Sequence, residues 1–206
     1  MIIGITGGIG SGKSSFARIL ADRGASLIDA DKIGHEILER ADVRRALVNS
    51  FGREIVDAEG RVDRGELGRR TFATAENLKT LNDIVHPPLV VEFKKQIREA
   101  AASGAGQKVI VDAALIYEWG DVELFDCIVV VEAGEEERLQ RIRARTGLNS
   151  KEIRRRMAAQ MPLAEKAARA DIVVQNNGSV EDLEAVADRL WRQWVADAEN
   201  SGEESQ

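Results

Sequence analysis

The feature that most restricts the fold of this chain is a glycine-rich segment near its start, Gly7-Gly-Ile-Gly-Ser-Gly-Lys-Ser14. It matches the pattern G-x-x-x-x-G-K-[ST] and lies between an apolar run at residues 2–6 and an amphipathic stretch. This pattern predicts a strand, a tight loop and a helix in that order. The glycines allow successive backbone N–H groups to point at phosphate oxygens, and the helix N-terminus adds partial positive charge. The sequence therefore predicts a loop that holds the phosphates of a nucleoside triphosphate.

Three side chains of this segment have separate predicted roles. Lys13 is expected to reach the β- and γ-phosphates, and the Ser14 hydroxyl is expected to bind Mg²⁺, which offsets charge on the same oxygens. Ser15 offers a second hydroxyl near the α-phosphate. The residues predicted to bind ATP here are Gly8, Gly10, Ser11, Gly12, Lys13, Ser14 and Ser15.

Five short β-branched runs predict the rest of the core: residues 2–6, 26–29, 108–112, 127–131 and 171–174. Each run is apolar throughout, which is typical of strands that are buried on both faces. The segments between the runs have helical periodicity. We therefore expect an α/β fold, a P-loop three-layer α/β/α sandwich with a five-stranded parallel sheet.

The spacing of the runs predicts two helical insertions. About 80 residues separate the second run from the third, far more than one crossover helix needs. Helical patterns occur there at 32–39, 43–51, 65–72, 75–84 and 89–101. Pro87-Pro88 is expected to separate the last two helices. The predicted organisation is a nucleotide-binding core at 1–31, 104–135 and 166–198, a helical substrate-binding insertion at 32–103, a helical lid at 136–165 and a disordered tail at 199–206.

The composition excludes several other classes of protein. Apolar residues make up 44% of the chain and charged residues 31%, which is too apolar for a chain that stays unfolded. The net charge of −6 provides no general basic field for nucleic acid or an anionic membrane. No apolar run approaches the ~18 residues of a membrane span, and no signal peptide is recognisable. The single cysteine, Cys127, cannot form an internal disulfide. We expect a cytoplasmic monomer or weak homo-oligomer that binds neither nucleic acid nor membrane.

Acidic residues follow two of the predicted strands. Asp29 and Asp31 come at the end of the second run, and Asp112 ends the third. Ligands of open parallel sheets bind at the carboxyl ends of the strands, so these acids are expected on the edge that carries the phosphate loop. Asp31 is a candidate base for an attacking hydroxyl, although it could instead cap the helix expected from residue 32. Asp112 is a candidate Mg²⁺ ligand, although it could equally be a turn residue.

A basic segment lies in the second insertion. Between Arg138 and Arg156 there are eight Lys or Arg residues and one acid, Glu152. Most such residues form a solvated helix face. A basic flap next to a phosphate site can also close over the transferred phosphoryl group and exclude water. Arg141 and Arg145, four residues apart on one helix face, are the candidates for that role.

Six blocks of sequence, taken in this order, resemble the dephospho-CoA kinase family over about residues 1–190. The blocks are Thr6-Gly-Gly-Ile-Gly-Ser-Gly-Lys-Ser14, Ile28-Asp-Ala-Asp-Lys-Ile-Gly-His35, His86-Pro87, Asp112-Ala-Ala-Leu-Ile-Tyr-Glu118, Ala158-Ala-Gln-Met-Pro162 and Ala170-Asp-Ile-Val-Val-Gln-Asn176. The chain departs from the family pattern at Ala114, where proline is usual, and at Arg138, where glutamine is common.

The resemblance implies transfer of the ATP γ-phosphoryl group to the ribose 3′-hydroxyl of dephospho-CoA, with Mg²⁺, in the last step of CoA biosynthesis. By this likeness Asp31 is the base, and Lys13 and Arg141 stabilise the transferred phosphoryl group. The residues implied on the acceptor side are Asp31, His35, His86, Leu115 and Glu118. The further residues assigned to ATP binding are Arg145, Asn176 and Gly178.

Three other interpretations of the sequence stay open. The chain could be another P-loop kinase that phosphorylates a small molecule or a nucleoside monophosphate. It could be an ATP-switched binding protein, although such a protein has no need of an acid that activates an alcohol. Binding of RNA through residues 138–156 is a third possibility, but that segment has no aromatic side chains on which bases could stack.

Overall fold

The computed structural model describes residues 1–102, 104, 107–120 and 122–203, and beyond residue 197 it describes the backbone alone. The chain divides into two compact units. The sheet unit consists of Met1–Asp29 and Ile97–Gln206, and the helical unit consists of Ala30–Gln96. Among the described residues, no helix is both long and apolar enough to cross a membrane.

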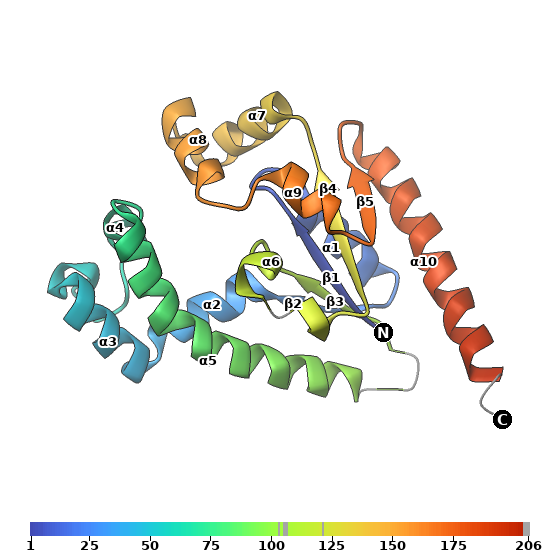
Figure 1. Ribbon diagram of the computed structural model, residues 1–206, viewed down its shortest axis with the longest axis horizontal. Coiled ribbons are helices and arrows are strands. Elements are labelled where there is room, and N and C mark those ends of the chain that lie inside the picture. The colour runs from blue at the N-terminus through green and yellow to red at the C-terminus, as the bar shows by residue number, and fades with distance from the viewer. Residues whose placement is uncertain (103, 105–106, 121, 204–206) are drawn as a thin grey trace. The chain divides into compact units, whose positions relative to one another are not determined.

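The helices are labelled in Figure 1. Their bounds are α1 Lys13–Asp22, α2 Ala30–Glu39, α3 Ala41–Phe51, α4 Arg64–Thr71, α5 Ala75–Ala101, α6 Ile116–Trp119, α7 Glu135–Thr146, α8 Ser150–Ala158, α9 Leu163–Ala168 and α10 Val180–Glu203, with short 3₁₀ turns η1 at Arg53–Ile55 and η2 at Val122–Leu124.

The sheet unit contains the predicted five-stranded parallel sheet. Its strands are β1 Ile2–Gly7, β2 Ser26–Asp29, β3 Val109–Asp112, β4 Cys127–Glu132 and β5 Ile172–Gln175, in the spatial order β2-β3-β1-β4-β5. Every pairing is parallel. The register aligns Asp29 with Asp112, and Asp112 with Ile5. The carboxyl ends of β2 and β3 therefore lie at the sheet edge from which the phosphate loop leaves β1, as the sequence predicted.

One face of the sheet carries the main hydrophobic core. Ile3 and Ile5 of β1 are fully buried in a cluster with Phe16 of α1 and Leu190 and Trp194 of α10. Burial of such large apolar side chains contributes about 2 kcal/mol each. This face therefore fixes α1, and with it the end of the phosphate loop, firmly on the sheet.

The opposite face of β1 carries α6. Side chains alternate along a strand, so Gly4 and Thr6 point away from the face of Ile3 and Ile5. A Cβ added at Gly4 would lie only 2.8 Å from Ile116 of α6, so glycine is needed for this close approach. With helices on both faces, the sheet unit is the expected α/β/α sandwich.

Local sequence signals account for the ends of two helices. Gly24 follows α1 with a φ of 108° and donates its N–H to the Ala21 carbonyl, as expected for a C′ glycine. Ser179 and Asp182 exchange hydrogen bonds between side chain and backbone N–H at 2.9 and 3.2 Å, which is a capping box at the start of α10. α10 continues to Glu203, so residues 199–203 of the expected tail are helical, and residues 204–206 lie outside the described part of the chain.

The expected break at Pro87-Pro88 is wrong, because α5 runs through both prolines. A proline fixes φ near a helical value and removes one backbone donor, so its cost in a helix is a lost hydrogen bond and a steric bend. The residues that follow bury one face of the helix at the spacing i, i+4, i+8: Leu89, Phe93 and Ile97 are 3–6% exposed. This burial offsets the cost of the two prolines.

The segment α7–α8 has a small hydrophobic cluster of its own. Leu139 and Ile142 of α7 and Ile153 of α8 are buried together, and Ile9 of the phosphate loop packs against them. Gly147, with a φ of 69°, ends α7. The predicted helical insertion after β4 is present, while the boundaries of a separate lid at 136–165 remain a prediction.

Candidate active site

The phosphate loop connects β1 to α1, and two of its glycines have a backbone that other residues rarely adopt. Gly10 has a φ of 82° and Gly12 a φ of 93°. A side chain at Gly12 would also collide with the amide nitrogen of Asn176. Inside the loop the Ser11 N–H donates to the Gly8 carbonyl at 3.0 Å. The glycines of the motif are therefore required both by backbone conformation and by space.

Lys13 lies at the start of α1 and reaches across to the end of β3. Its Nζ is 2.6 Å from Oδ1 of Asp112 and 3.4 Å from Oγ of Ser14. The Lys13 and Asp112 side chains are only 11% and 6% exposed, so water screens this ion pair poorly. Three predicted site residues from two distant parts of the sequence thus meet at one point. Ser15, the next residue of α1, is exposed.

The donor set at this point suits Mg²⁺ bound together with phosphates. Among the described residues, no group of three or more His, Cys, Asp or Glu side chains could hold a metal ion alone. Mg²⁺ typically takes one or two protein oxygens and completes its shell with water and substrate phosphates. Asp112 and Ser14, both beside Lys13, offer one carboxylate and one hydroxyl. The residues present therefore fit this ion.

Asn176 and Arg141 both bind the outside of the phosphate loop. The Asn176 amide donates to the Ser11 carbonyl at 2.7 Å, and Arg141 donates to the same carbonyl at 3.5 Å and to the Asn176 carbonyl at 3.0 Å. Asn176, which the resemblance assigned to the adenine side, is 8% exposed and directly supports the loop. Arg145 is exposed one turn further along α7, and Gly178 is exposed just before α10.

The basic segment of the sequence separates into two groups. Arg138 and Arg141 of α7 contact the phosphate loop. Arg154 and Arg156 of α8 form surface ion pairs instead, Arg154 with Glu135 at 3.2 Å and Arg156 with an acid one turn before it in α8 at 3.5 Å. The solvated-face interpretation thus fits Arg154 and Arg156, while closure of a basic flap over the transferred phosphoryl group stays a prediction.

Glu118 pairs with a fully buried lysine that the sequence did not predict. The Lys166 side chain of α9 is fully buried; its Nζ lies 2.8 Å from Glu118 Oε1 and donates to the Ala114 carbonyl at 2.6 Å. Glu118 also accepts the Met161 N–H at 3.0 Å. Burial lowers the pKa of Lys166, and the Glu118 carboxylate opposes that shift. Leu115, partly buried, precedes α6 in the same loop.

No sequence signal identified Lys166, because lysine is mostly exposed and the motif Leu163-Ala-Glu-Lys-Ala-Ala168 reads as an ordinary surface helix. The charge of Lys13 also lowers the pKa of Lys166, which places Lys166 within electrostatic reach of the phosphate site. Lys166 thus links the loop after β3 to the segment that returns from α8.

The remaining predicted site residues belong to the helical unit. Asp31 and His35 are exposed and lie four residues apart in α2, so they share a face of that helix. α2 begins at Ala30 instead of residue 32, and Asp31 is therefore inside the first turn and not the residue before it. His86 lies half-buried within α5. The roles of these three residues remain predictions.

The sheet order, the phosphate loop and the contact of Lys13 with Asp112 define a nucleotide-binding protein of the P-loop class. A family model described as dephospho-CoA kinase matches residues 1–182. The chain belongs to the dephospho-CoA kinase family. It is 40% identical over 199 residues to a dephospho-CoA kinase of Carboxydothermus hydrogenoformans, which covers 94% of this chain and 96% of the relative.

Two solved structures resemble most of the chain. A crystal structure of TT1252 from Thermus thermophilus is 35% identical with a TM-score of 0.77, covering 94% of this chain and 97% of that one. The dephospho-CoA kinase of Campylobacter jejuni, at 24% identity, has a TM-score of 0.63 and covers 94% and 96%. At that identity the second likeness shows the fold alone.

Proposed function

We propose that this protein transfers the γ-phosphoryl group of ATP to the ribose 3′-hydroxyl of dephospho-CoA, giving CoA and ADP in the final step of CoA biosynthesis. The observation that carries the proposal is the meeting of Lys13, Ser14 and Asp112 at the carboxyl end of the sheet. Membership of the dephospho-CoA kinase family supplies the acceptor.

The nucleotide binds through the phosphate loop. The N–H groups of Gly8, Gly10 and Gly12 surround the phosphates, Ser11 lies between these glycines, and the hydroxyls of Ser14 and Ser15 lie at the helix end. Lys13 exchanges its contact with Asp112 for the β- and γ-phosphates, which is favourable because a phosphate carries more charge than a carboxylate. Arg145 adds charge at the phosphates, and Asn176 and Gly178 border the adenine side.

Mg²⁺ would be held by Ser14 and Asp112 together with the phosphates, and when bound it neutralises charge on the oxygens of the transferred group. Release of Asp112 from Lys13 makes its carboxylate available at the moment the triphosphate arrives. Asp112 thus pairs with Lys13 before ATP binds, and after ATP binds its carboxylate would be available to Mg²⁺.

Asp31 acts as the base. It orients the ribose 3′-hydroxyl and accepts its proton while the hydroxyl oxygen forms a bond to the γ-phosphorus and the bond to the β-phosphate oxygen breaks. Lys13 and Arg141 stabilise the charge on the transferred phosphoryl group, and ADP leaves with the bridging oxygen. His35, His86, Leu115 and Glu118 position the acceptor.

The test is the product itself. Purified protein with ATP, Mg²⁺ and dephospho-CoA is expected to give CoA, detected by mass spectrometry, with one ADP for each CoA. A panel of nucleoside monophosphates and sugars is run in parallel, and a higher kcat/KM for any of these than for dephospho-CoA contradicts the proposal. ATP hydrolysis that is equal with and without every acceptor would instead favour an ATP-switched binding protein.

A further inference from the structure

Ile9 of the phosphate loop is held by three separate contacts within the sheet unit. Its carbonyl accepts a hydrogen bond from Nε of Arg138 at 3.0 Å, and its N–H donates to Oε1 of Gln160 at 3.0 Å. Its side chain packs against the buried cluster of α7 and α8. Both peptide groups of one loop residue are therefore bonded to side chains that come from beyond residue 137.

Arg138 is an unusual partner for a loop, because its charge is buried. The residue is 9% exposed, and no carboxylate of the described residues lies within 4.0 Å of its guanidinium. Burial lowers the pKa of Arg138, with the charge of Glu135 opposing. A Cβ added at Gly8 would lie 2.5 Å from its Nη2, so the guanidinium lies directly on the loop. A buried cation without a paired acid is costly unless an anion is bound close by.

The position of these bonds determines what they can do. The phosphates are bound by loop N–H groups, so the loop conformation must keep those donors converging on one point. A loop with four glycines in eight residues loses much conformational freedom when it becomes ordered. Bonds from Arg138 and Gln160 fix the orientation of the two peptide groups that flank Ile9 before any nucleotide arrives. Preorganisation of this kind increases affinity without a new ligand contact.

We propose that Ile9 connects the phosphate loop to α7 and α8, and that Arg138 and Gln160 are positioning residues for ATP. Arg138 acts in two ways: its Nε holds the Ile9 carbonyl, and its charge lies behind the loop where it favours a polyphosphate. Since α7 also carries Arg141, the same contacts of Ile9 keep that arginine next to the loop. The inference rests on the proposed use of ATP, but it does not depend on the identity of the acceptor.

Two substitutions at position 138 separate the hydrogen bond from the charge. Glutamine places its Nε2 at the same distance along the side chain as the arginine Nε, so Arg138→Gln retains the donor and loses the charge. Arg138→Met has the same length up to that atom and loses both. Gln160→Met removes the acceptor for the Ile9 N–H. The matched control is Arg154→Met, which removes an exposed arginine that pairs with Glu135 on the surface.

The experiment measures the Kd of ATP by calorimetry, the KM of dephospho-CoA and the unfolding temperature of each variant. Arg138→Met and Gln160→Met are expected to raise the Kd of ATP about tenfold, Arg138→Gln by less, and Arg154→Met by less than twofold. The KM of dephospho-CoA is expected to stay within twofold in every variant.

Two results would overturn the inference. One is an ATP Kd within twofold of the starting protein in both Arg138→Met and Gln160→Met, whatever happens to the unfolding temperature. The other is an equal weakening of ATP binding by Arg154→Met. Because ATP binding is measured without acceptor, failure to form CoA would sink the proposed function and leave this inference intact.

Discussion

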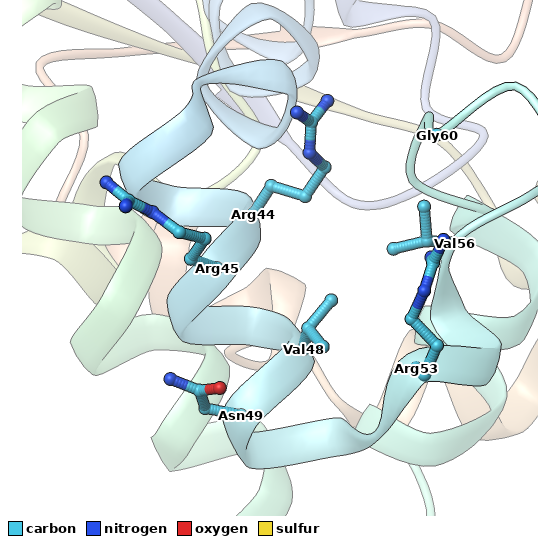
Figure 2. Close-up of a pocket in the computed structure, with 7 residues that line it drawn as sticks. All are labelled: Arg44, Arg45, Val48, Asn49, Arg53, Val56 and Gly60. Carbon is cyan, nitrogen blue, oxygen red and sulfur yellow. The ribbon is translucent and has the colours of Figure 1, made fainter.

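Arginines gather in two regions of the molecule, and the two regions treat them differently. In the sheet unit, Arg138 and Arg141 donate to carbonyls of the phosphate loop and its neighbour Asn176. In the helical unit, Arg44 and Arg45 of α3 and Arg53 of η1 line an open pocket of about 280 Å³ (Figure 2). Arg138 and Arg141 of α7 hold the backbone of the phosphate loop, whereas the arginines of α3 and η1 line a pocket that is open to solvent.

The contacts of the pocket arginines are those of a surface. Arg44 lies 3.9 Å from the Glu39 carboxylate, and Arg45 donates to the carbonyl one turn before it in α3 at 3.2 Å. Figure 2 shows the Arg45 side chain directed away from the segment that carries Arg53 and Val56. Arg45 and Arg53 are exposed, so water satisfies and screens their charges.

Charge density alone therefore does not identify a phosphate site. What distinguishes Arg138 and Arg141 is that they are buried or half-buried and donate to backbone carbonyls of the phosphate loop. In that setting a guanidinium has fixed geometry and low screening. We therefore expect the sheet unit to control ATP binding, and the helical unit to act on turnover through Asp31.

The largest expected effect tests the part assigned to the helical unit. Asp31→Asn removes the base but leaves the phosphate loop untouched, so kcat is expected to fall about 10²–10⁴-fold while the Kd of ATP is unchanged. Steady-state kinetics and ATP calorimetry check this. Asp42→Asn is the matched control, because Asp42 is the second residue of α3 as Asp31 is of α2. Unchanged kcat in Asp31→Asn would remove that residue from the base role.

Lys13→Ala tests the sheet unit. Removal of its charge is expected to lower kcat/KM about 10²–10³-fold and also to weaken ATP binding, since Lys13 is assigned to the β- and γ-phosphates. Loss of both quantities distinguishes it from Asp31→Asn. The control is Lys151→Ala at the exposed start of α8. If Lys13→Ala bound ATP normally, the division of labour between the two units would be wrong.

Glu118→Gln tests a buried cation, Lys166, that is paired with an acid, in contrast to Arg138. Loss of the carboxylate leaves the Lys166 charge buried, and the free energy of unfolding at pH 7 is expected to fall by about 2 kcal/mol. Denaturant unfolding, with Glu123→Gln as the control, measures it.

The pH dependence of that loss has a fixed sign. The folded-state pKa of Lys166, already lowered by burial, falls further without Glu118. Between that pKa and the ordinary value of 10.5, the unfolded chain binds more protons than the folded one, so stability in Glu118→Gln rises with pH. The deficit is expected to be smaller at pH 10 than at pH 7, and a deficit that grows with pH would show that Lys166 is not the group responsible.

Much of the fold and the centre of the site could be predicted from sequence because their signals are local. The motif that ends in Lys13-Ser14, the apolar runs and the acid at the end of β3 are all readable without knowledge of tertiary contacts. Family membership was recognisable from the same blocks. The continuous α5 was not predicted, because burial after Pro88 outweighs the local cost of the prolines.

The supporting residues of the site were missed for a related reason. In the sequence, Arg138 is one of several basic residues and a departure from the family pattern, and Gln160 is part of a block that resembles the family. Neither signal predicts their hydrogen bonds to Ile9. Lys166 lies in a stretch with surface composition, yet it is fully buried. Contacts between segments 48 to 151 residues apart leave no periodicity in a single sequence, and their geometry decides the function of each residue.

The smallest expected effect concerns the pocket arginines of the helical unit. If the pocket arginines are a solvated surface, the double variant Arg44→Met/Arg53→Met should change kcat, the ATP Kd and the KM of dephospho-CoA by less than about twofold. The acceptor contains a diphosphate, and a basic pocket in the helical unit is a place where such a group could bind. A tenfold rise in the KM of dephospho-CoA, with the ATP Kd unchanged and a rise that shrinks at high salt, would make the pocket part of the acceptor site and show that exposed arginines suffice there.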